Sequence, residues 1–252
     1  MRKYHLLLLP SLLMLLFALN IANGQDIHWT YEGEEGPDHW DELMPEYALC
    51  GEGRAQSPID ITGEQTVNLA DLALNYGSSA LNIFNNGHTI QVNYDEGSSL
   101  VYNENEYALV QFHFHHPSEH TLDGESFGME LHFVHRDANG ALAVVGVMLG
   151  EGMDDNAAYV PIFDNLPVEE GEPEATDLTV NAADLVPEGY HYYTYMGSLT
   201  TPPCTQGVRW LVLDTPVVLS AAQMAAFEAI FEMNARPVQP LNVRDLLYDT
   251  GM

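Results

Sequence analysis

The sequence predicts a mixed, β-rich α+β fold, in which one domain surrounds a large, mostly antiparallel, twisted central sheet with a few short peripheral helices. Three observations lead to this prediction. Short apolar or alternating runs recur between Gly, Asn and Asp residues, which is typical of strands joined by turns. Only one segment carries a full set of helix signals. Hydrophobic residues make up 46% of the 252 residues, which is enough for a large core and argues against wholesale disorder.

The first 24 residues differ in composition from the rest. Arg2 and Lys3 precede an apolar run over residues 6–21, and small residues ending at Gly24 follow it. This order is typical of a secretory signal peptide. We therefore expect residues 1–24 to be removed, residues 25–252 to fold, and the mature protein to be secreted or periplasmic. An uncleaved membrane anchor is the alternative, but the run is shorter than the roughly 20 apolar residues that a span needs.

Eight runs after the leader predict strands. They combine apolar, aromatic and β-branched residues and are bounded by turn-forming residues. In chain order they cover residues 57–61, 89–94, 100–102, 108–115, 129–135, 141–149, 190–195 and 209–213. No internal repeat or composition break divides the chain, which favours a single domain.

One helix is expected over residues 221–233. Ser220 is a suitable N-cap and Gln223 follows three residues later, which is the pattern of a capping box. Apolar residues then recur at helical spacing, and Pro237 lies beyond the expected end.

The stretch 168–177 is rich in acidic residues, and we expect it to be a solvated loop. A calcium site is the alternative, although the run does not match an EF-hand loop.

The charge balance excludes several partners. Lys3 is the only lysine, and removing it with Arg2 leaves five arginines against 37 acidic residues, a net charge of −32. Such a surface repels nucleic acid and anionic lipid, and no stretch after the leader is apolar enough to cross a membrane. Because salt screens repulsion between like charges, we hypothesise that the protein is halotolerant and works in marine or more saline water.

Two cysteines, Cys50 and Cys204, are present. An even number of cysteines in an exported protein favours a disulfide. For a loop of about 150 residues the chain-entropy model gives a stabilisation of roughly 5 kcal/mol, as an upper figure. A Cys–His metal site is the alternative, but neither cysteine lies in a CxxC pair or beside a histidine.

Six of the eleven histidines fall between His113 and His135. In a strand, alternate side chains share a face, so His113 and His115 point the same way and can share a metal ion. Either His132 or His135 on the next strand could be the third ligand; the two point to opposite faces, and parity alone does not choose between them. Three imidazoles with an open fourth position are typical of catalytic zinc.

Each ligand histidine also needs a partner for its other ring nitrogen. Gln111 and Glu130 share the faces of the candidate ligands and could supply such acceptors. The alternative is that all of these are ordinary, half-exposed strand histidines that bind no metal.

Several blocks of this sequence, in order, resemble the α-class carbonic anhydrases, and the resemblance covers nearly all of the mature chain. The blocks are 56–59 (QSPI), 85–88 (NNGH), 111–115 (QFHFH), 118–121 (SEHT), 130–132 (ELH), 198–204 (SLTTPPC) and 234–240 (NARPVQP). Small departures occur at His116 and Gln91, where many animal members carry Trp and Asn; these put details of the pocket in doubt.

The resemblance implies a zinc lyase that hydrates carbon dioxide reversibly to bicarbonate and a proton. It selects His132 as the third ligand beside His113 and His115. It implies that zinc-bound hydroxide attacks carbon dioxide; the pKa of about 7 for the bound water is a value established with carbonic anhydrases themselves. It also implies that Thr200 accepts a hydrogen bond from the hydroxide and donates its own to Glu119.

Further roles follow from the same resemblance. Thr201 would contact bicarbonate, and His88 would carry the released proton to buffer. Tyr31 and Asn86 would order the water chain between the metal and His88. Carbon dioxide would be received by an apolar wall made of Val134, Val144, Leu199 and Trp210. The block around Cys50 fits the family's disulfide-bearing start.

Two other functions are weighed against this one. The first is a non-catalytic binding protein on the same scaffold, which is disfavoured because such relatives lose zinc ligands. The second is a zinc esterase that uses the same nucleophile. As a partner, the resemblance to bacterial members allows a homodimer.

Overall fold

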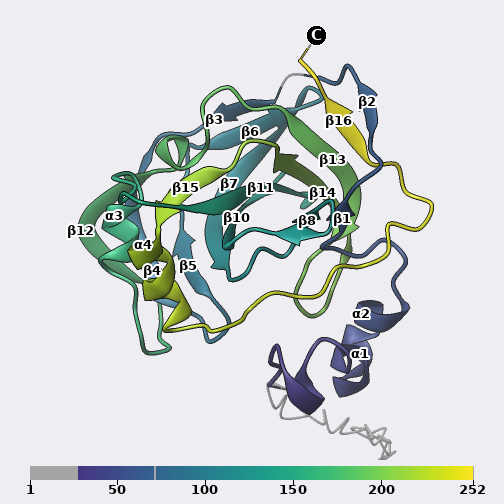
Figure 1. The fold of residues 1–252 in the computed structure, drawn as a ribbon, viewed down its shortest axis with the longest axis horizontal. Coiled ribbons are helices and arrows are strands. Elements are labelled where there is room, and N and C mark those ends of the chain that lie inside the picture. Colours follow the sequence, from purple (N-terminus) through teal and green to yellow (C-terminus); the bar gives the residue numbers. More distant parts are fainter. Residues whose placement is uncertain (1–27, 71, 252) are drawn as a thin grey trace, which may run out of the picture.

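A computed structural model describes residues 28–70 and 72–251 of the chain (Figure 1). The expected signal peptide and its cleavage site lie outside these residues. Among the described helices, none is long and apolar enough to cross a membrane.

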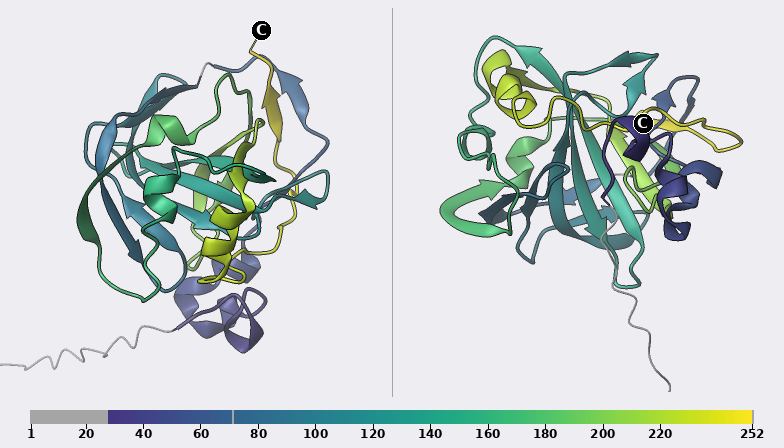
Figure 2. Two further views of the ribbon diagram at one scale, coloured as in Figure 1. Left: turned by 60° about the vertical axis from the view of Figure 1, so that its left-hand side comes forward. Right: turned by 90° about the horizontal axis from the view of Figure 1, so that it is seen from below.

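A large twisted sheet of 13 strands forms the body of the molecule (Figures 1 and 2). Its main path runs in the order β12-β4-β5-β7-β10-β11-β14-β13-β16-β2, with β3, β6 and β15 paired beside it. Most neighbours are antiparallel; β11 pairs in parallel with β14 and β15, and β16 with β2. The strands are β2 Gln65–Val67, β3 Ala73–Asn75, β4 Ser78–Asn85, β5 Ile90–Asn93, β6 Ser99–Tyr102, β7 Asn105–His115, β10 Met129–Arg136, β11 Leu142–Gly152, β12 Glu174–Asn181, β13 Tyr192–Ser198, β14 Gln206–Leu213, β15 Val217–Ser220 and β16 Leu247–Asp249.

Small elements surround this sheet, as the predicted fold class requires. A separate three-stranded sheet contains β1 Asp60–Ile61, β8 Thr121–Leu122 and β9 Glu125–Ser126. The α-helices are α1 Trp40–Leu43, α2 Leu49–Glu52, α3 Val160–Phe163 and α4 Ala221–Glu228. Short 3-10 helices cover Gly33–Glu35, Pro45–Tyr47 and Ala182–Leu185. The predicted β-rich fold with a mostly antiparallel central sheet is confirmed.

The predicted helix begins where expected but is shorter. Ser220 and Gln223 form the capping box, yet α4 ends at Glu228 and does not reach Met233. Tertiary hydrogen bonds explain the difference. The backbone N–H of Asn234 donates to the carbonyl of His116 (2.9 Å), and the Asn234 side chain accepts from the His116 N–H (2.7 Å). These bonds hold the following segment extended beside the sheet, and they compete with further helical turns.

The acidic stretch 168–177 is a loop only in part. From Glu174 onward the chain forms β12, which pairs with β4 at the edge of the sheet. The prediction of a loop was therefore wrong for the last residues of the stretch. The strand continues through Thr176, Thr179 and Val180, whose β-branched side chains favour an extended backbone.

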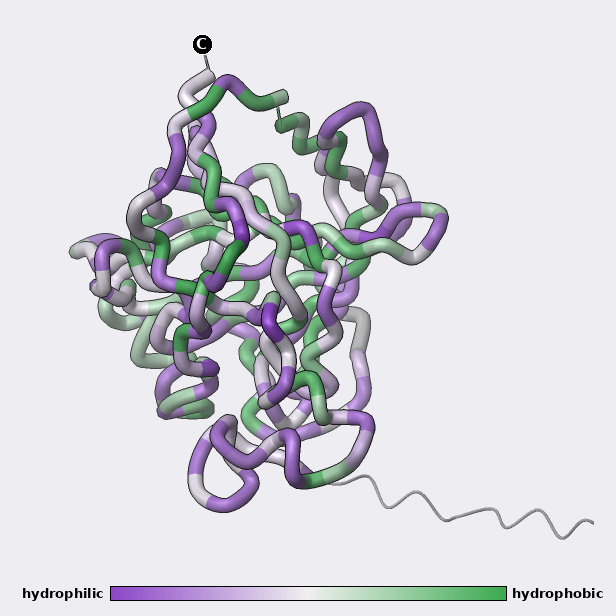
Figure 3. Tube along the Cα trace, turned by 90° about the vertical axis from the view of Figure 1, so that its right-hand side faces the viewer, coloured by the Kyte–Doolittle hydropathy of each residue, from purple (hydrophilic) through white to green (hydrophobic). Residues whose placement is uncertain are grey.

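The sheet separates two hydrophobic cores, and this separation positions the site. The larger core contains Phe112, Phe114 and Phe133, together with buried residues of α3 and α4. The smaller core, on the opposite face of β10 and β11, contains Val144 and Trp210. The N-terminal segment beside the grey trace is mostly hydrophilic (Figure 3).

Candidate metal centre

Two neighbouring strands bring three histidines to one point. β7 and β10 are antiparallel, with His132 directly opposite His113 and Glu130 opposite His115. The ring centroids lie 5.0 Å apart for His113–His115, 5.3 Å for His113–His132 and 4.6 Å for His115–His132. One ring nitrogen from each lies within 4.8 Å of the others. His135, the alternative third ligand, lies on the other face, where it bonds to Tyr76.

Each of these three histidines has one ring nitrogen held by a hydrogen-bond acceptor. The Nδ1 atom of His113 lies 2.9 Å from Oε1 of Gln111, and Nδ1 of His115 lies 2.7 Å from the carbonyl oxygen of Asn234. These oxygens accept, so each Nδ1 carries a hydrogen and each Nε2 keeps a lone pair. In His132 the two nitrogens exchange roles. Its Nε2 donates to Oε1 of Glu130 at 2.9 Å, and its Nδ1 keeps the lone pair.

The residues fit a divalent metal ion. Nε2 of His115 and Oε2 of Glu119 are buried without a hydrogen-bond partner among the described residues, a costly arrangement unless something else satisfies them. Burial lowers the pKa of all three histidines, that of His115 to about 4. The imidazoles are therefore neutral, which is the form that binds metal.

A second group of possible ligands, His120, Glu130 and His132, is already paired internally. Oε1 of Glu130 accepts from Nδ1 of His120 (2.8 Å) as well as from His132, and Oε2 accepts the N–H groups of Glu119 and His120. Burial raises the pKa of Glu130, but the two histidines outweigh burial and hold it well below its usual range. This charged acceptor fixes the orientation of His132, and it needs no metal of its own.

Glu119 lies between the histidines and the chain's C-terminal segment. Its Oε2 is 3.5 Å from Nε2 of His115 and 3.8 Å from Nδ1 of His132. Its Oε1 accepts the backbone N–H of Arg236 at 2.9 Å. Burial raises the pKa of Glu119 to about 7, while His132, the Arg236 amide and the Thr200 hydroxyl lower it. The structure thus brings the predicted Glu119 and Thr200 together beside the three histidines.

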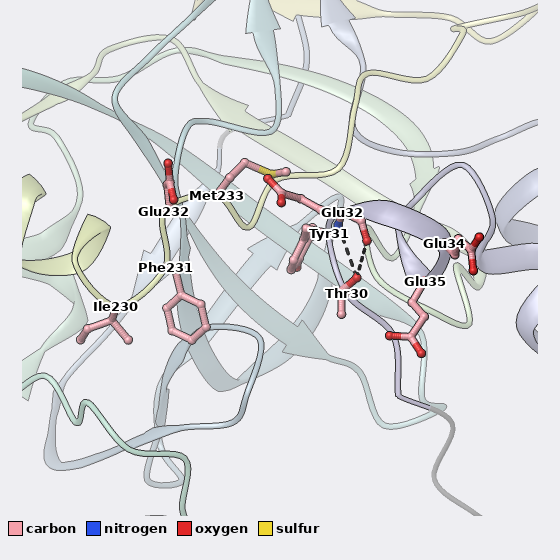
Figure 4. A pocket seen from close by; sticks show the side chains of 9 residues that line it. All are labelled: Thr30, Tyr31, Glu32, Glu34, Glu35, Ile230, Phe231, Glu232 and Met233. Atoms are coloured by element: carbon pink, nitrogen blue, oxygen red, sulfur yellow. Dashed lines mark hydrogen bonds between the residues drawn. The ribbon is translucent and has the colours of Figure 1, made fainter.

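A cavity of about 130 Å³ opens onto the candidate metal centre. Seven predicted site residues line it: Tyr31, Asn86, His88, Gln111, His113, His115 and Thr201. Three lining residues were not predicted for the site, namely Trp29, Thr89 and Gln91. Tyr31 also lines a wider depression of about 740 Å³, between the N-terminal segment and residues 230–233 (Figure 4).

The four residues of the predicted apolar wall lie outside this cavity and pack in or against the smaller core. Val144 and Trp210 are buried in the smaller core, and Val134 and Leu199 pack against it. The Trp210 ring lies 4.8 Å from that of His132, and its Nε1–H donates to the carbonyl of Ser198 (3.0 Å). None of the four lines the 130 Å³ cavity. The polar cavity and this apolar cluster therefore flank the centre separately.

Comparison with known families decides the identity. The family description of eukaryotic-type carbonic anhydrases matches residues 35–250. This chain belongs to the α-carbonic anhydrase family. The enzyme class that the sequence predicted, a lyase that hydrates carbon dioxide reversibly, follows from this membership.

Relatives of the same family match most of the chain. It is 44% identical to a carbonic anhydrase of Nostoc over 88% of this chain and 86% of the relative, and 41% identical to that of Pectobacterium atrosepticum over 94% and 98%. Among solved structures, a hyperthermostable carbonic anhydrase from a hydrothermal vent chimney has a TM-score of 0.84 at 45% identity, over 88% of this chain and 100% of that one. A dioscorin of Dioscorea polystachya is also similar, at 33% identity over 97% and 94%.

In this α-carbonic anhydrase the cysteines form the expected disulfide, Cys50–Cys204. It packs with Trp40, and the partly buried Trp29 and Tyr31 join the same cluster. The N-terminal segment that carries Tyr31 is therefore tied to the loop that carries Thr200 and Thr201.

Sequence reasoning missed two contacts at this centre. The first is the Asn234 carbonyl that holds His115, although the block 234–240 is part of the family resemblance. The second is Trp29, whose ring stacks on His88 with centroids 3.6 Å apart and planes 7° from parallel. A backbone carbonyl leaves no signal in a residue pattern, and Trp29 is remote from His88 in the chain.

Proposed function

We propose that this chain hydrates carbon dioxide with a zinc ion held by His113, His115 and His132. One observation carries the proposal. The three imidazoles converge from two paired strands, each with one nitrogen bound to an acceptor and the other left toward a common point. Imidazole nitrogens suit zinc, and zinc is typical of the family.

When bound in such a site, zinc lowers the pKa of a water ligand to about 7, a value established with carbonic anhydrase itself, and so supplies a nucleophile at neutral pH. The protein's part is to hold the three rings rigidly. Gln111, Glu130 and the Asn234 carbonyl do this, since each fixes one ring's tautomer and direction.

Glu119 and Thr200 orient the nucleophile. A divalent cation beside Glu119 would lower the pKa of this carboxyl again and favour the carboxylate. The Thr200 hydroxyl then donates to the carboxylate, which leaves the hydroxyl oxygen to accept a hydrogen bond from the nucleophile. One lone pair of the nucleophile would thereby be directed at the substrate, and Thr201, which lines the cavity, would contact bicarbonate.

Carbon dioxide is small and apolar, so it needs an apolar surface more than a charged one. Val134, Val144, Leu199 and Trp210 supply such a surface beside His132.

The proton released in each turnover leaves through the polar cavity. His88 is half-buried at its edge and can accept the proton on a ring nitrogen and pass it to buffer. Tyr31 lines the path. Asn86 lines it too, but its Oδ1 accepts the N–H groups of His88 and Thr89 (3.0 and 2.9 Å). Asn86 therefore also shapes the turn that carries His88.

Measuring metal content and carbon dioxide hydration before and after chelation tests the proposal. Zinc at one equivalent, loss of hydration on chelation and recovery on adding zinc are expected. Folded protein that takes up no zinc, or that hydrates carbon dioxide equally well without it, would contradict it. Ester cleavage measured on the same preparations distinguishes the esterase alternative, and hydration no faster than the uncatalysed rate would favour the binding protein.

We also propose export with removal of residues 1–24. The disulfide supports a periplasmic or extracellular location, because such bonds persist in oxidising compartments. N-terminal sequencing of the mature protein should begin at Gln25.

A further inference from the structure

His88, the proposed proton carrier, is held by several segments of the chain. Asn86 accepts its backbone N–H, and the side-chain amide of Asn234 donates to its carbonyl (3.0 Å). Trp29 covers one face of its ring. His28, which is exposed, lies 6.3 Å from it between ring centroids. These contacts fix the backbone of His88 and one side of its imidazole.

A loop from a distant part of the sequence also docks on this turn. The side-chain amide of Asn85 donates to the carbonyl of Val168 (3.0 Å), and the N–H of Gly171 donates to the carbonyl of Asn85 (3.0 Å). Asn85 and Glu170 form an isolated parallel β-bridge. The loop is thereby anchored to the residue that begins the turn, three positions before His88.

The docking places the carboxylate of Glu170 against Gly87. A Cβ atom on Gly87 would lie 3.2 Å from the Glu170 carboxyl carbon and 3.3 and 3.4 Å from its two oxygens. Gly87 also has φ +86°, a conformation that other residues rarely adopt. Glycine at this position therefore allows both the turn and the close approach of a negative charge to the residue beside His88.

Three influences on the pKa of His88 oppose one another. Burial lowers the pKa of His88, the neighbouring His28 lowers it further, and Glu170 raises it. Burial and His28 both disfavour the protonated imidazole that a proton carrier must form. Glu170 alone of these groups stabilises it.

We propose that Glu170 is a positioning residue for proton export, whose carboxylate stabilises the protonated imidazole of His88 at the edge of the cavity. The inference rests on the proposed function, since it assigns His88 the proton that hydration releases. One N–H bond forms on His88 and breaks again when buffer takes the proton. Glu170 keeps its negative charge throughout. Because Glu170 is exposed, its influence should weaken as salt increases.

The test compares Glu170→Gln with Glu169→Gln, which removes the same charge from the adjacent exposed position. Carbon dioxide hydration is measured in weak buffer and with added imidazole, and carbon dioxide–bicarbonate exchange is measured at equilibrium by isotope labelling. Glu170→Gln should lower turnover in weak buffer by roughly two- to threefold, the size expected for one exposed charge pair. Exchange should be unchanged, imidazole should restore turnover, and 1 M NaCl should abolish the difference. His88→Ala should show a larger defect of the same kind.

An NMR titration of His88 gives a second readout that does not depend on activity. The His88 pKa should fall in Glu170→Gln and stay at the wild-type value in Glu169→Gln. Equal turnover of the two variants in weak buffer, or an unshifted His88 titration in Glu170→Gln, would overturn the inference. A wild-type protein with no hydration even in strong buffer would instead refute the proposed function, while the titration would still report on the Glu170–His88 pair.

Discussion

The two histidines of β10, His132 and His135, are both fully buried, but they face opposite cores of the molecule. His132 gives one ring nitrogen to Glu130 and leaves the other toward His113 and His115. His135 uses both nitrogens. Its Nδ1 donates to the carbonyl of Ala143 (3.3 Å), so its Nε2 accepts from the hydroxyl of Tyr76 (2.8 Å). Burial alone therefore does not identify a metal ligand; a ring nitrogen that lies close to the nitrogens of other imidazoles does.

Replacing each of these two histidines in turn gives the largest expected difference between variants. His132→Ala should bind zinc at least about 100-fold more weakly and lose hydration accordingly, since losing even the partner of a ligand costs 10- to 100-fold. His135→Gln should keep zinc and most activity but lower the free energy of unfolding by about 1–3 kcal/mol, because the flexible Gln side chain does not reproduce both buried hydrogen bonds of the ring, to Tyr76 and to the Ala143 carbonyl. Zinc affinity by chelator competition and urea unfolding measure the two effects. The reverse pattern would mean that the two faces have been assigned wrongly.

The groups behind the ligands sharpen the comparison. Glu130 is a buried, charged acceptor shared by two histidines, whereas Gln111 is neutral and bonds to His113 alone. Glu130→Gln should therefore weaken zinc binding by roughly 10- to 100-fold, and Gln111→Ala by less. Chelator competition on both variants checks the order. An unchanged zinc affinity in Glu130→Gln would show that the charge of Glu130 contributes nothing beyond its hydrogen bonds.

The two β10 histidines also show how far a sequence can predict such a site. Strand alternation places His113 and His115 together and sends His132 and His135 to opposite faces, because the side-chain period is fixed by the backbone. It does not give the register of β7 against β10, so the third ligand had to come from the family resemblance. The end of α4 and the strand β12 were missed for a related reason. Tertiary pairing at Asn234 and with β4 overrides the local pattern, and a local pattern does not contain its tertiary partners.

A change of pH should act on the His135 face through stability. Burial lowers the pKa of His135 to about 3, against about 6.5 in the unfolded chain. Below pH 6.5 the unfolded state therefore binds a proton that the folded state does not bind. The free energy of unfolding then falls by up to about 1.4 kcal/mol for each unit that the pH is lowered. Wild type should lose about 3 kcal/mol more than His135→Gln between pH 6.5 and pH 4. Urea unfolding of both proteins across this range measures the difference. Parallel pH profiles for the two proteins would contradict it.

Salt should stabilise the protein by screening its surface charges, and the two buried histidines should not contribute to this effect. The mature chain would carry a net charge of −32, and self-repulsion of this kind destabilises a compact state until salt screens it. Raising NaCl from 0.05 to 1 M should raise the unfolding midpoint by roughly 2–4 °C, which corresponds to about 1 kcal/mol for a domain of this size. Sucrose at equal osmolality controls for effects that are not ionic.

His135→Gln should show the same salt response as wild type, because residue 135 is buried away from the surface charges. A protein no more stable in high salt than in low salt would refute the halotolerance hypothesis, and a response that depended on residue 135 would mean that its face is less shielded than its burial indicates.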